Sequence, residues 1–191
     1  WVRPSKPSEN VRQAIFAFKG DVYQGLDASS LSKSEIKYTQ KNLLILSGLY
    51  GMLKPLDLMY PYRLEMGTKM KNKRGDNLYE FWGSKINRSI NELAKENKSK
   101  AIVNLASVEY FSVLSKNALD LPVISPIFKD YKNGQYKIIS FFAKKARGTM
   151  TRFIMQNKVK KVEDLAGFNL DGYRYSEKES EEFSPVFLRK S

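Results

Sequence analysis

The chain contains no cysteine and no histidine. These absences exclude disulfides, thiolate and imidazole metal sites, and the Cys/His and Ser/His/Asp arrangements of nucleophilic catalysis. If the protein is an enzyme, its acid–base chemistry falls to Asp, Glu, Lys or Tyr. No metal site and no cofactor are expected from this composition.

Long hydrophobic runs are also missing. The longest apolar windows, such as "NLLILSGLYGMLK", are far shorter than the ~20 residues that a membrane-spanning helix needs. No signal-peptide pattern is visible at the start. We therefore expect a soluble cytoplasmic protein. The sequence begins with Trp1 rather than methionine, which leads us to expect that an N-terminal segment is missing.

Acidic residues are outnumbered by basic ones. The 191 residues include 33 Lys and Arg against 20 Asp and Glu, which gives a formal net charge of +13. Such a surplus favours polyanionic partners, nucleic acid first and small anionic metabolites or nucleotides second. The alternative is a lysine-rich surface whose charges are simply solvated.

The hydrophobic pattern predicts an α/β fold with α+β character in a single globular domain, residues 1–191. We expect one mixed sheet that is parallel in its first part and antiparallel after residue 122, where Asn133-Gly134 closes a hairpin. The expected strands are 14–18, 43–48, 101–107, two within 122–143, and two short ones near the C-terminus. The expected helices are 30–42, 77–98, 108–115 and 144–158, with a smaller one in "VEDLAGF".

The segment 144–161, "KKARGTMTRFIMQNKVKK", carries seven basic residues and no acidic one. If it is helical, Arg147 and Arg152 project from one side, with Lys144 and Lys145 at the N-terminal end. Such a helix would attract phosphate groups. The alternative is a solvated amphipathic helix that packs its apolar side chains on the sheet.

Three strand ends supply further candidates, because ligands of such sheets bind beyond the carboxyl ends of the strands. Lys19 could contact phosphate, and Asp21 could act as a general base or cap the next helix. Glu109 follows Ser107, which we expect to be a helix N-cap, and is the second candidate for acid–base chemistry.

The third strand end leads into "SGLYGMLKPLDLMYPYRLEM", residues 47–66. Gly48 and Gly51 permit a close backbone approach, while prolines fix the path of the chain. We expect Tyr50, Tyr62 and Arg63 to form the rim of an anion-binding cleft. A tight packed turn, or an ion pair between Arg63 and Glu65, are the alternatives.

Five motifs, in order, resemble the YaaA family of bacterial peroxide-stress proteins: "RQAIFAFKGDVYQGL", "LSGLYGMLKPLDLMYPYRLEMG", "LYEFWG", "NLASVEYF" and "KIISFFAKKARGTMTRFI". The resemblance covers about Arg12 to Phe187. Family members begin with a hydrophobic strand and a Ser-Pro-Ala-Lys-type turn that this sequence lacks, which implies an N-terminal truncation.

The resemblance implies a cytosolic protein that limits hydrogen peroxide damage, is linked to lower free intracellular iron, and binds double-stranded DNA with low sequence specificity. It also implies a helix-hairpin-helix-like element, for which the Gly48–Gly51 turn and the Gly148 segment are the two candidates. The implied basic cleft draws on six residues: Lys19, Arg63, Lys144, Lys145, Arg147 and Arg152. Without histidine there is no ferritin-like iron site, so an effect on iron is expected to be indirect. Two further hypotheses are an enzyme that acts on a nucleotide or nucleic-acid base through carboxylates, and a protein-interaction module.

Overall fold

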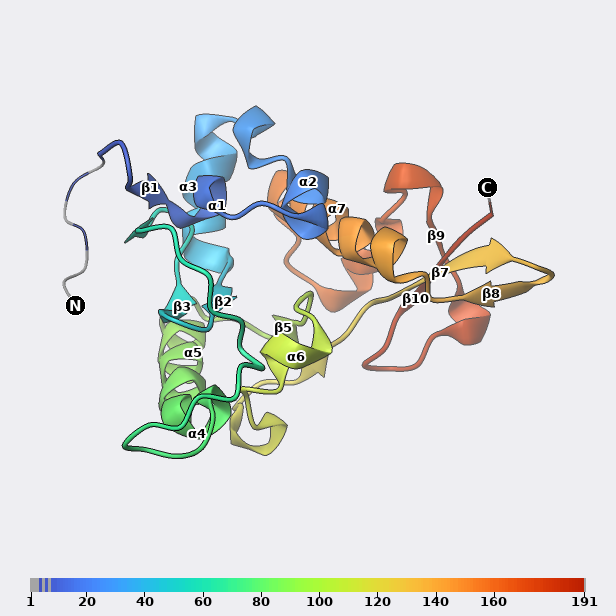
Figure 1. The fold of residues 1–191 in the computed structure, drawn as a ribbon. Helices are drawn as coiled ribbons and strands as arrows, with labels where there is room; N and C mark the ends of the chain where they lie inside the picture. Colours follow the sequence, from blue (N-terminus) through green and yellow to red (C-terminus); the bar gives the residue numbers. More distant parts are fainter. Residues whose placement is uncertain (1–3, 5, 7, 191) are drawn as a thin grey trace. The chain divides into compact units, whose positions relative to one another are not determined.

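The structure, a computed structural model, describes residues 4, 6 and 8–190 (Figure 1). It combines helices with small mixed sheets, so the predicted α/β class is confirmed. The chain forms two compact units that are described separately. Unit 1 comprises the described residues up to Ala17 together with Thr39–Ser99 and Ala106–Leu121, and unit 2 comprises Phe18–Tyr38, Lys100–Leu105 and the described residues from Pro122 onward. The single-domain organisation stays a prediction.

Unit 1 is built from two antiparallel strand pairs and short helices. Strand β1 (Arg12–Gln13) pairs with β4 (Leu58–Met59), and β2 (Ile45–Ser47) pairs with β3 (Gly51–Leu53). The helices are α1 (Ala14–Ala17), the C-terminal part of α3 (Lys33–Asn42), α4 (Leu78–Trp82), α5 (Lys85–Glu96), α6 (Val108–Phe111) and the 3₁₀ helix η2 (Lys116–Ala118). Their apolar faces meet in a core that includes Leu53, Met66, Leu78, Ile86 and Ile90.

Unit 2 contains a four-stranded mixed sheet in the order β8 (Gln135–Lys137), β7 (Ile127–Lys132), β10 (Val186–Arg189), β9 (Arg174–Tyr175). Strands β7 and β10 are parallel, and the two outer pairs are antiparallel. A separate parallel pair joins β5 (Ile102–Val103) to β6 (Val123–Ile124). The helices are α2 (Asp21–Leu26), α7 (Ser140–Asn157), the N-terminal part of α3, and the 3₁₀ helices η1 (Ala28–Ser30), η3 (Val162–Gly167), η4 (Leu170–Gly172) and η5 (Glu177–Glu179).

Aromatic rings fill the core of unit 2. Phe128 of β7 stacks on Phe187 of β10 with ring centroids 5.5 Å apart, and Phe168 meets both rings edge-on. Helix α7 adds Ala146 and Met150, which are almost fully buried. The buried face of α7 is therefore fixed on the sheet, and its other side chains must point away from this core.

Most local predictions agree with the structure. Helices α3, α6 and α7 lie where they were expected, Ser107 is the N-cap of α6, and the β7–β8 hairpin turns at Asn133-Gly134 with positive φ at both residues. The predicted antiparallel C-terminal hairpin is thus confirmed.

Three predictions are wrong. Residues 14–18 were expected to be a strand, but Ala14–Ala17 form one helical turn whose first amides donate to Asp57 O and Pro55 O. The single helix over 77–98 is broken at Gly83, whose φ of 48° and ψ of −133° are not helical. The first part of the chain is not uniformly parallel: β1–β4 and β2–β3 are antiparallel, and among the described strands before residue 122 only β5 forms a parallel pair, with β6. After residue 122, where antiparallel pairing was expected, β7 and β10 pair in parallel.

Among the described residues, no helix is both long and apolar enough to cross a membrane.

Candidate nucleic-acid interface

Helix α7 carries most of the predicted cations of unit 2. Helix α7 packs against α2, and the two helices are labelled in Figure 1. Two glycines, Gly25 and Gly148, lie where the backbones meet. A Cβ added at Gly25 would lie 2.1 Å from Lys145 O, and one added at Gly148 would lie 1.8 Å from Val22 O. Only glycine permits this approach of the two backbones, so α2 and α7 form one rigid support for the side chains along their edges.

Lys144 and Lys145 are exposed, and Arg147 is half-buried. Burial lowers the pKa of the Arg147 guanidinium, although the group stays protonated at neutral pH because an arginine pKa starts so high. Within the part of the chain that the structure describes, the Arg147 side chain has no ion pair and no hydrogen-bond acceptor. A partly desolvated cation without a protein anion beside it favours binding of an external anion.

Arg152 has a different environment, although it lies on the same helix. Its Nη1 donates to Leu26 O at 3.1 Å and to Asp27 O at 3.0 Å, and lies 3.7 Å from the Asp27 carboxylate. These carbonyls are at the C-terminus of α2, where a cation is favoured by the helix dipole. Hydrogen bonds from Ser30 and Ser29, with a smaller contribution from Arg152, lower the pKa of Asp27. Arg152 therefore ties α7 to α2.

Lys19 and Asp21 flank the start of α2. Lys19 is exposed, and Gly20 is the N-cap with a φ of 139°. Asp21 is the first residue of the helix rather than its cap, a position that the helix dipole favours for a carboxylate. The location of Asp21 is thus explained by the helix, whether or not it takes part in chemistry.

In unit 1, the Gly48–Gly51 turn joins strands β2 and β3. Tyr50 is buried, and its hydroxyl accepts a hydrogen bond of 2.9 Å from Tyr60 N. Trp82 Nε1 donates to Gly48 O at 3.0 Å, and its ring would clash with a Cβ at Gly51. The packed-turn alternative therefore describes this segment, and a buried Tyr50 is a poor contact for an external ligand.

Neither glycine position forms a helix-hairpin-helix. The Gly48–Gly51 turn connects two strands, and Gly148 lies in the middle of a continuous helix that runs from Ser140 to Asn157. Both assignments of this element were wrong: the Gly-x-x-Gly spacing at Gly48–Gly51 does not specify what it connects, and Gly148 is required by the close contact of α7 with α2.

Tyr62 is half-buried and shares a hydrogen bond of 2.5 Å with Ser47 Oγ. Burial raises the pKa of Tyr62, so its hydroxyl remains protonated at neutral pH. Arg63 and Glu65 are both exposed, and their side chains do not form an ion pair in the described part of the chain. Arg63 is thus an exposed cation of unit 1, and the hydroxyl of the adjacent Tyr62 is engaged in the hydrogen bond with Ser47.

Glu109 is held by the backbone of the segment before it. Its Oε1 accepts a hydrogen bond of 2.8 Å from Gly67 N, and its backbone oxygen accepts one of 3.0 Å from Tyr79. Burial is the main cause that raises the pKa of the neighbouring Tyr110 to about 12, and Tyr62, Glu109 and Glu65 add to it. Glu109 therefore fixes a loop in unit 1, whereas the other candidate carboxylate, Asp21, belongs to unit 2.

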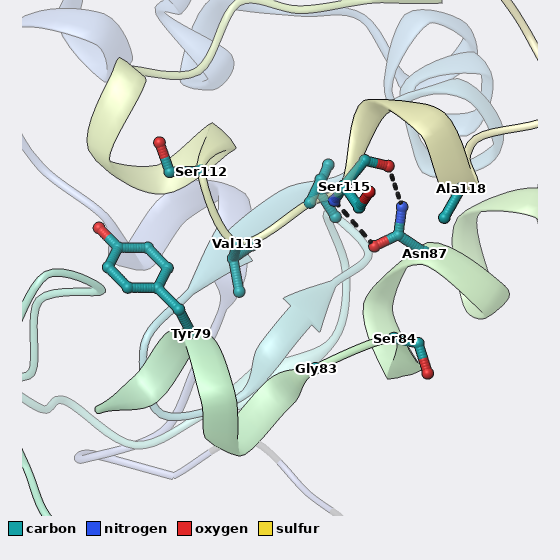
Figure 2. Close-up of a pocket in the computed structure, with 9 residues that line it drawn as sticks. Tyr79, Gly83, Ser84, Asn87, Ser112, Val113, Ser115 and Ala118 are labelled. Atoms are coloured by element: carbon teal, nitrogen blue, oxygen red, sulfur yellow. Dashed lines mark hydrogen bonds between the residues drawn. The ribbon is translucent and has the colours of Figure 1, made fainter. Parts of the chain in front are cut away.

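A cavity of about 280 Å³ in unit 1 was missed by the sequence analysis (Figure 2). Asn87 lines it, donating to Ser115 O at 2.8 Å and accepting from Ser115 N at 3.3 Å. The hydroxyls of Tyr79 and Ser112 at its wall already donate to backbone oxygens. The sequence offered no signal for this hollow, because its polar residues come from two separate stretches, 79–87 and 112–118.

The predicted site residues are distributed over both units. Unit 2 holds Lys19, Lys144, Lys145, Arg147 and Arg152, while unit 1 holds Tyr50, Tyr62 and Arg63. The unit 2 residues lie on α7 or immediately before α2, two helices that pack on each other. In the described residues there is no group of three or more carboxylates that could hold a metal ion.

Comparisons with known proteins match this chain to one family model and to several related proteins. Residues 1–179 match the family model described as peroxide stress protein YaaA. A UPF0246 protein of Aliivibrio fischeri is 60% identical over 182 residues, which cover 95% of this chain and 70% of the relative. UPF0246 proteins of Shewanella baltica (57% over 188 residues, 98% of this chain and 73% of the relative) and Pseudoalteromonas translucida (56% over 190 residues, 99% and 73%) are similar to it as well.

Proposed function

The chain belongs to the peroxide stress protein YaaA family, and we propose that it binds double-stranded DNA in the cytoplasm with low sequence specificity. The contact runs along α7, through Lys144, Lys145 and Arg147, with Lys19 at the start of α2. The observation that carries the proposal is Arg147, a half-buried guanidinium with no protein anion beside it in the described part of the chain.

Charge supports a phosphate backbone as the partner. The whole chain carries a net charge of +13, and residues 144–161 contain no carboxylate. Phosphate contacts made by Lys and Arg position a protein on DNA without reading its sequence. We propose low sequence specificity for this reason: the cations named here suit phosphates, and lysine ammonium groups act as point charges.

The link to iron, in this proposal, is indirect. With no cysteine and no histidine, the chain lacks the side chains that iron sites use most. Protein bound along DNA would shield the duplex where iron and peroxide react, and this would connect DNA binding with peroxide stress.

The test is duplex binding as a function of salt, with a labelled oligonucleotide duplex. Lys144→Glu combined with Lys145→Glu should weaken binding at least about tenfold and reduce the slope of log affinity against log salt by roughly two, because each lysine neutralises one phosphate. Both lysines are exposed, so the fold should be unaffected.

The matched control is Lys33→Glu with Lys37→Glu, which changes the net charge equally on two exposed positions of α3. Arg152 is left unchanged because it stabilises the α2–α7 contact. If both double variants bind the duplex equally well, binding depends on overall charge and the proposed interface is wrong.

A further inference from the structure

The chain leaves β8 and enters α7 through a short connection (Figure 1). Three apolar side chains at this connection and in the first turn of α7 are exposed. Ile138 is 59% exposed, Phe141 55% and Phe142 39%. We call these three residues the apolar patch. Single exposed apolar residues are ordinary, whereas exposed rings in contact, such as Phe141 and Phe142, form a contiguous apolar surface of the kind that marks a binding site.

The two phenylalanines of the patch are held differently. The Arg189 guanidinium lies 4.6 Å from the centroid of the Phe142 ring, and Arg189 Nε donates to Asp130 Oδ1 at 2.6 Å. Phe142 is therefore anchored to the sheet. Phe141 meets only the Phe142 ring, with centroids 5.6 Å apart, among the described aromatic and cationic groups. The Phe141 ring is thus presented to solvent by a fixed neighbour.

Charge around the patch limits what can cover it. Lys144 and Lys145 follow Phe141 by three and four residues, so all three lie on one face of α7. Residues 131–147 contain no acidic residue. A second copy of the chain would bring the same positive charge to this face, and like charges repel. The occupant that fits is a polyanion that also carries flat apolar groups.

We propose that Phe141 is a stacking platform for an unpaired base of single-stranded nucleic acid, and that Lys144 and Lys145 bind the phosphates on either side of that base. The inference rests on the proposed DNA binding of α7 and adds a single-strand contact to it. Aromatic side chains beside a basic surface bind single strands with little sequence preference, because every base has a π-face.

An anionic membrane surface is the other macromolecule that exposed phenylalanine and lysine can bind. Helices that lie on membranes separate an apolar face from a charged one. On α7 the exposed ring and the lysines share a face, while the main apolar face is buried in the core of unit 2. This arrangement favours a nucleic acid strand.

The experiment compares a labelled oligo(dT) with a duplex of equal length, by fluorescence anisotropy at low salt. Phe141→Ala should weaken oligo(dT) binding about fivefold or more, which corresponds to roughly 1 kcal/mol of stacking, and should change duplex binding less than about twofold. Phe141→Trp should retain oligo(dT) binding. Phe141→Leu keeps an apolar side chain without a ring, so it should behave as Phe141→Ala does.

Phe16→Ala is the matched control, because Phe16 is also exposed but belongs to unit 1. Unchanged oligo(dT) binding by Phe141→Ala, or equal binding by the Leu and Trp variants, overturns the platform even if duplex binding persists. Vesicles that contain phosphatidylserine form a further arm: if Phe141→Ala loses vesicle binding while oligo(dT) binding is unchanged, the patch is a membrane contact. Absence of both oligo(dT) and duplex binding in the unmodified protein refutes the proposed function itself.

Discussion

The contact between α2 and α7 depends on Gly148, and the substitution Gly148→Ala tests this directly. A methyl group at this position would lie 1.8 Å from Val22 O and 2.8 Å from Leu26 N, where ordinary contact begins at 3.4 Å. Both obstacles are backbone atoms of a helix, so no side-chain rotation can relieve the clash. The two helices would have to separate.

Two opposing effects determine how much Gly148→Ala changes the free energy of unfolding. Alanine is favoured over glycine in the interior of a helix by about 1 kcal/mol. Overpacking of a tight interior costs about 1 to 3 kcal/mol, and this site is at the upper end because the obstacle is backbone. Separation of the helices also weakens the two hydrogen bonds from Arg152 to the end of α2. We expect a net loss of about 2 kcal/mol or more in the free energy of unfolding.

Urea and thermal unfolding measure this loss, and about 2 kcal/mol corresponds to a decrease in Tm of roughly 4 to 8 °C for a chain of this size. Gly167→Ala is the matched control: its added carbon would lie 3.6 Å from the Phe153 ring, an ordinary contact distance, so it should be close to neutral. If Gly148→Ala is as stable as the unmodified protein, or more stable, the close packing of α2 on α7 is refuted.

Two further predictions concern the hairpin and high pH. Gly134→Ala should cost about 1 kcal/mol because the residue has a φ of 81°, although no atom lies within 4 Å of the added carbon; unchanged urea unfolding would contradict this. Tyr110 keeps its proton to a pKa of about 12 in the folded state, against a usual value of 10.0. Between these values the folded state binds more protons than the unfolded state, so stability should fall as pH rises from about 10 to about 12. Tyr110→Phe should make that decline shallower in unfolding curves measured across this range, and an identical decline would exclude Tyr110 as its cause.

Local signals in the sequence predicted local structure well. Asn133-Gly134 predicted a tight hairpin because both residues readily adopt positive φ. Ser30 and Ser32 were both available as caps for the helix expected at 30–42; in the structure the Ser32 hydroxyl accepts from Glu35 N, and the Glu35 carboxylate accepts from Ser32 N. This reciprocal pair is a capping box, and it marks a helix start from four residues alone.

Features that depend on distant partners were not predicted. The apolar run at 14–18 fits a buried strand or a short helix equally well, and the carbonyls of Pro55 and Asp57 decide between them by accepting the amides of Ile15 and Ala14. The pairing of β2 is decided by the turn that follows it, which returns the chain directly to form β3. No periodicity within the sequence carries that information.

The candidate site also has one feature that the sequence predicted and one that depends on distant residues. The sequence identified the basic character of α7, but it treated Arg147 and Arg152 as equivalent. Arg152 lies beside the C-terminal carbonyls of α2 and the Asp27 carboxylate, which attract the guanidinium and would repel a phosphate. Arg147 has no such acceptor in the described part of the chain. A phosphate backbone that follows α7 should therefore contact Arg147 and the segment before it, where Lys144 and Lys145 share a face with Phe141, and should leave the helix before it reaches Arg152.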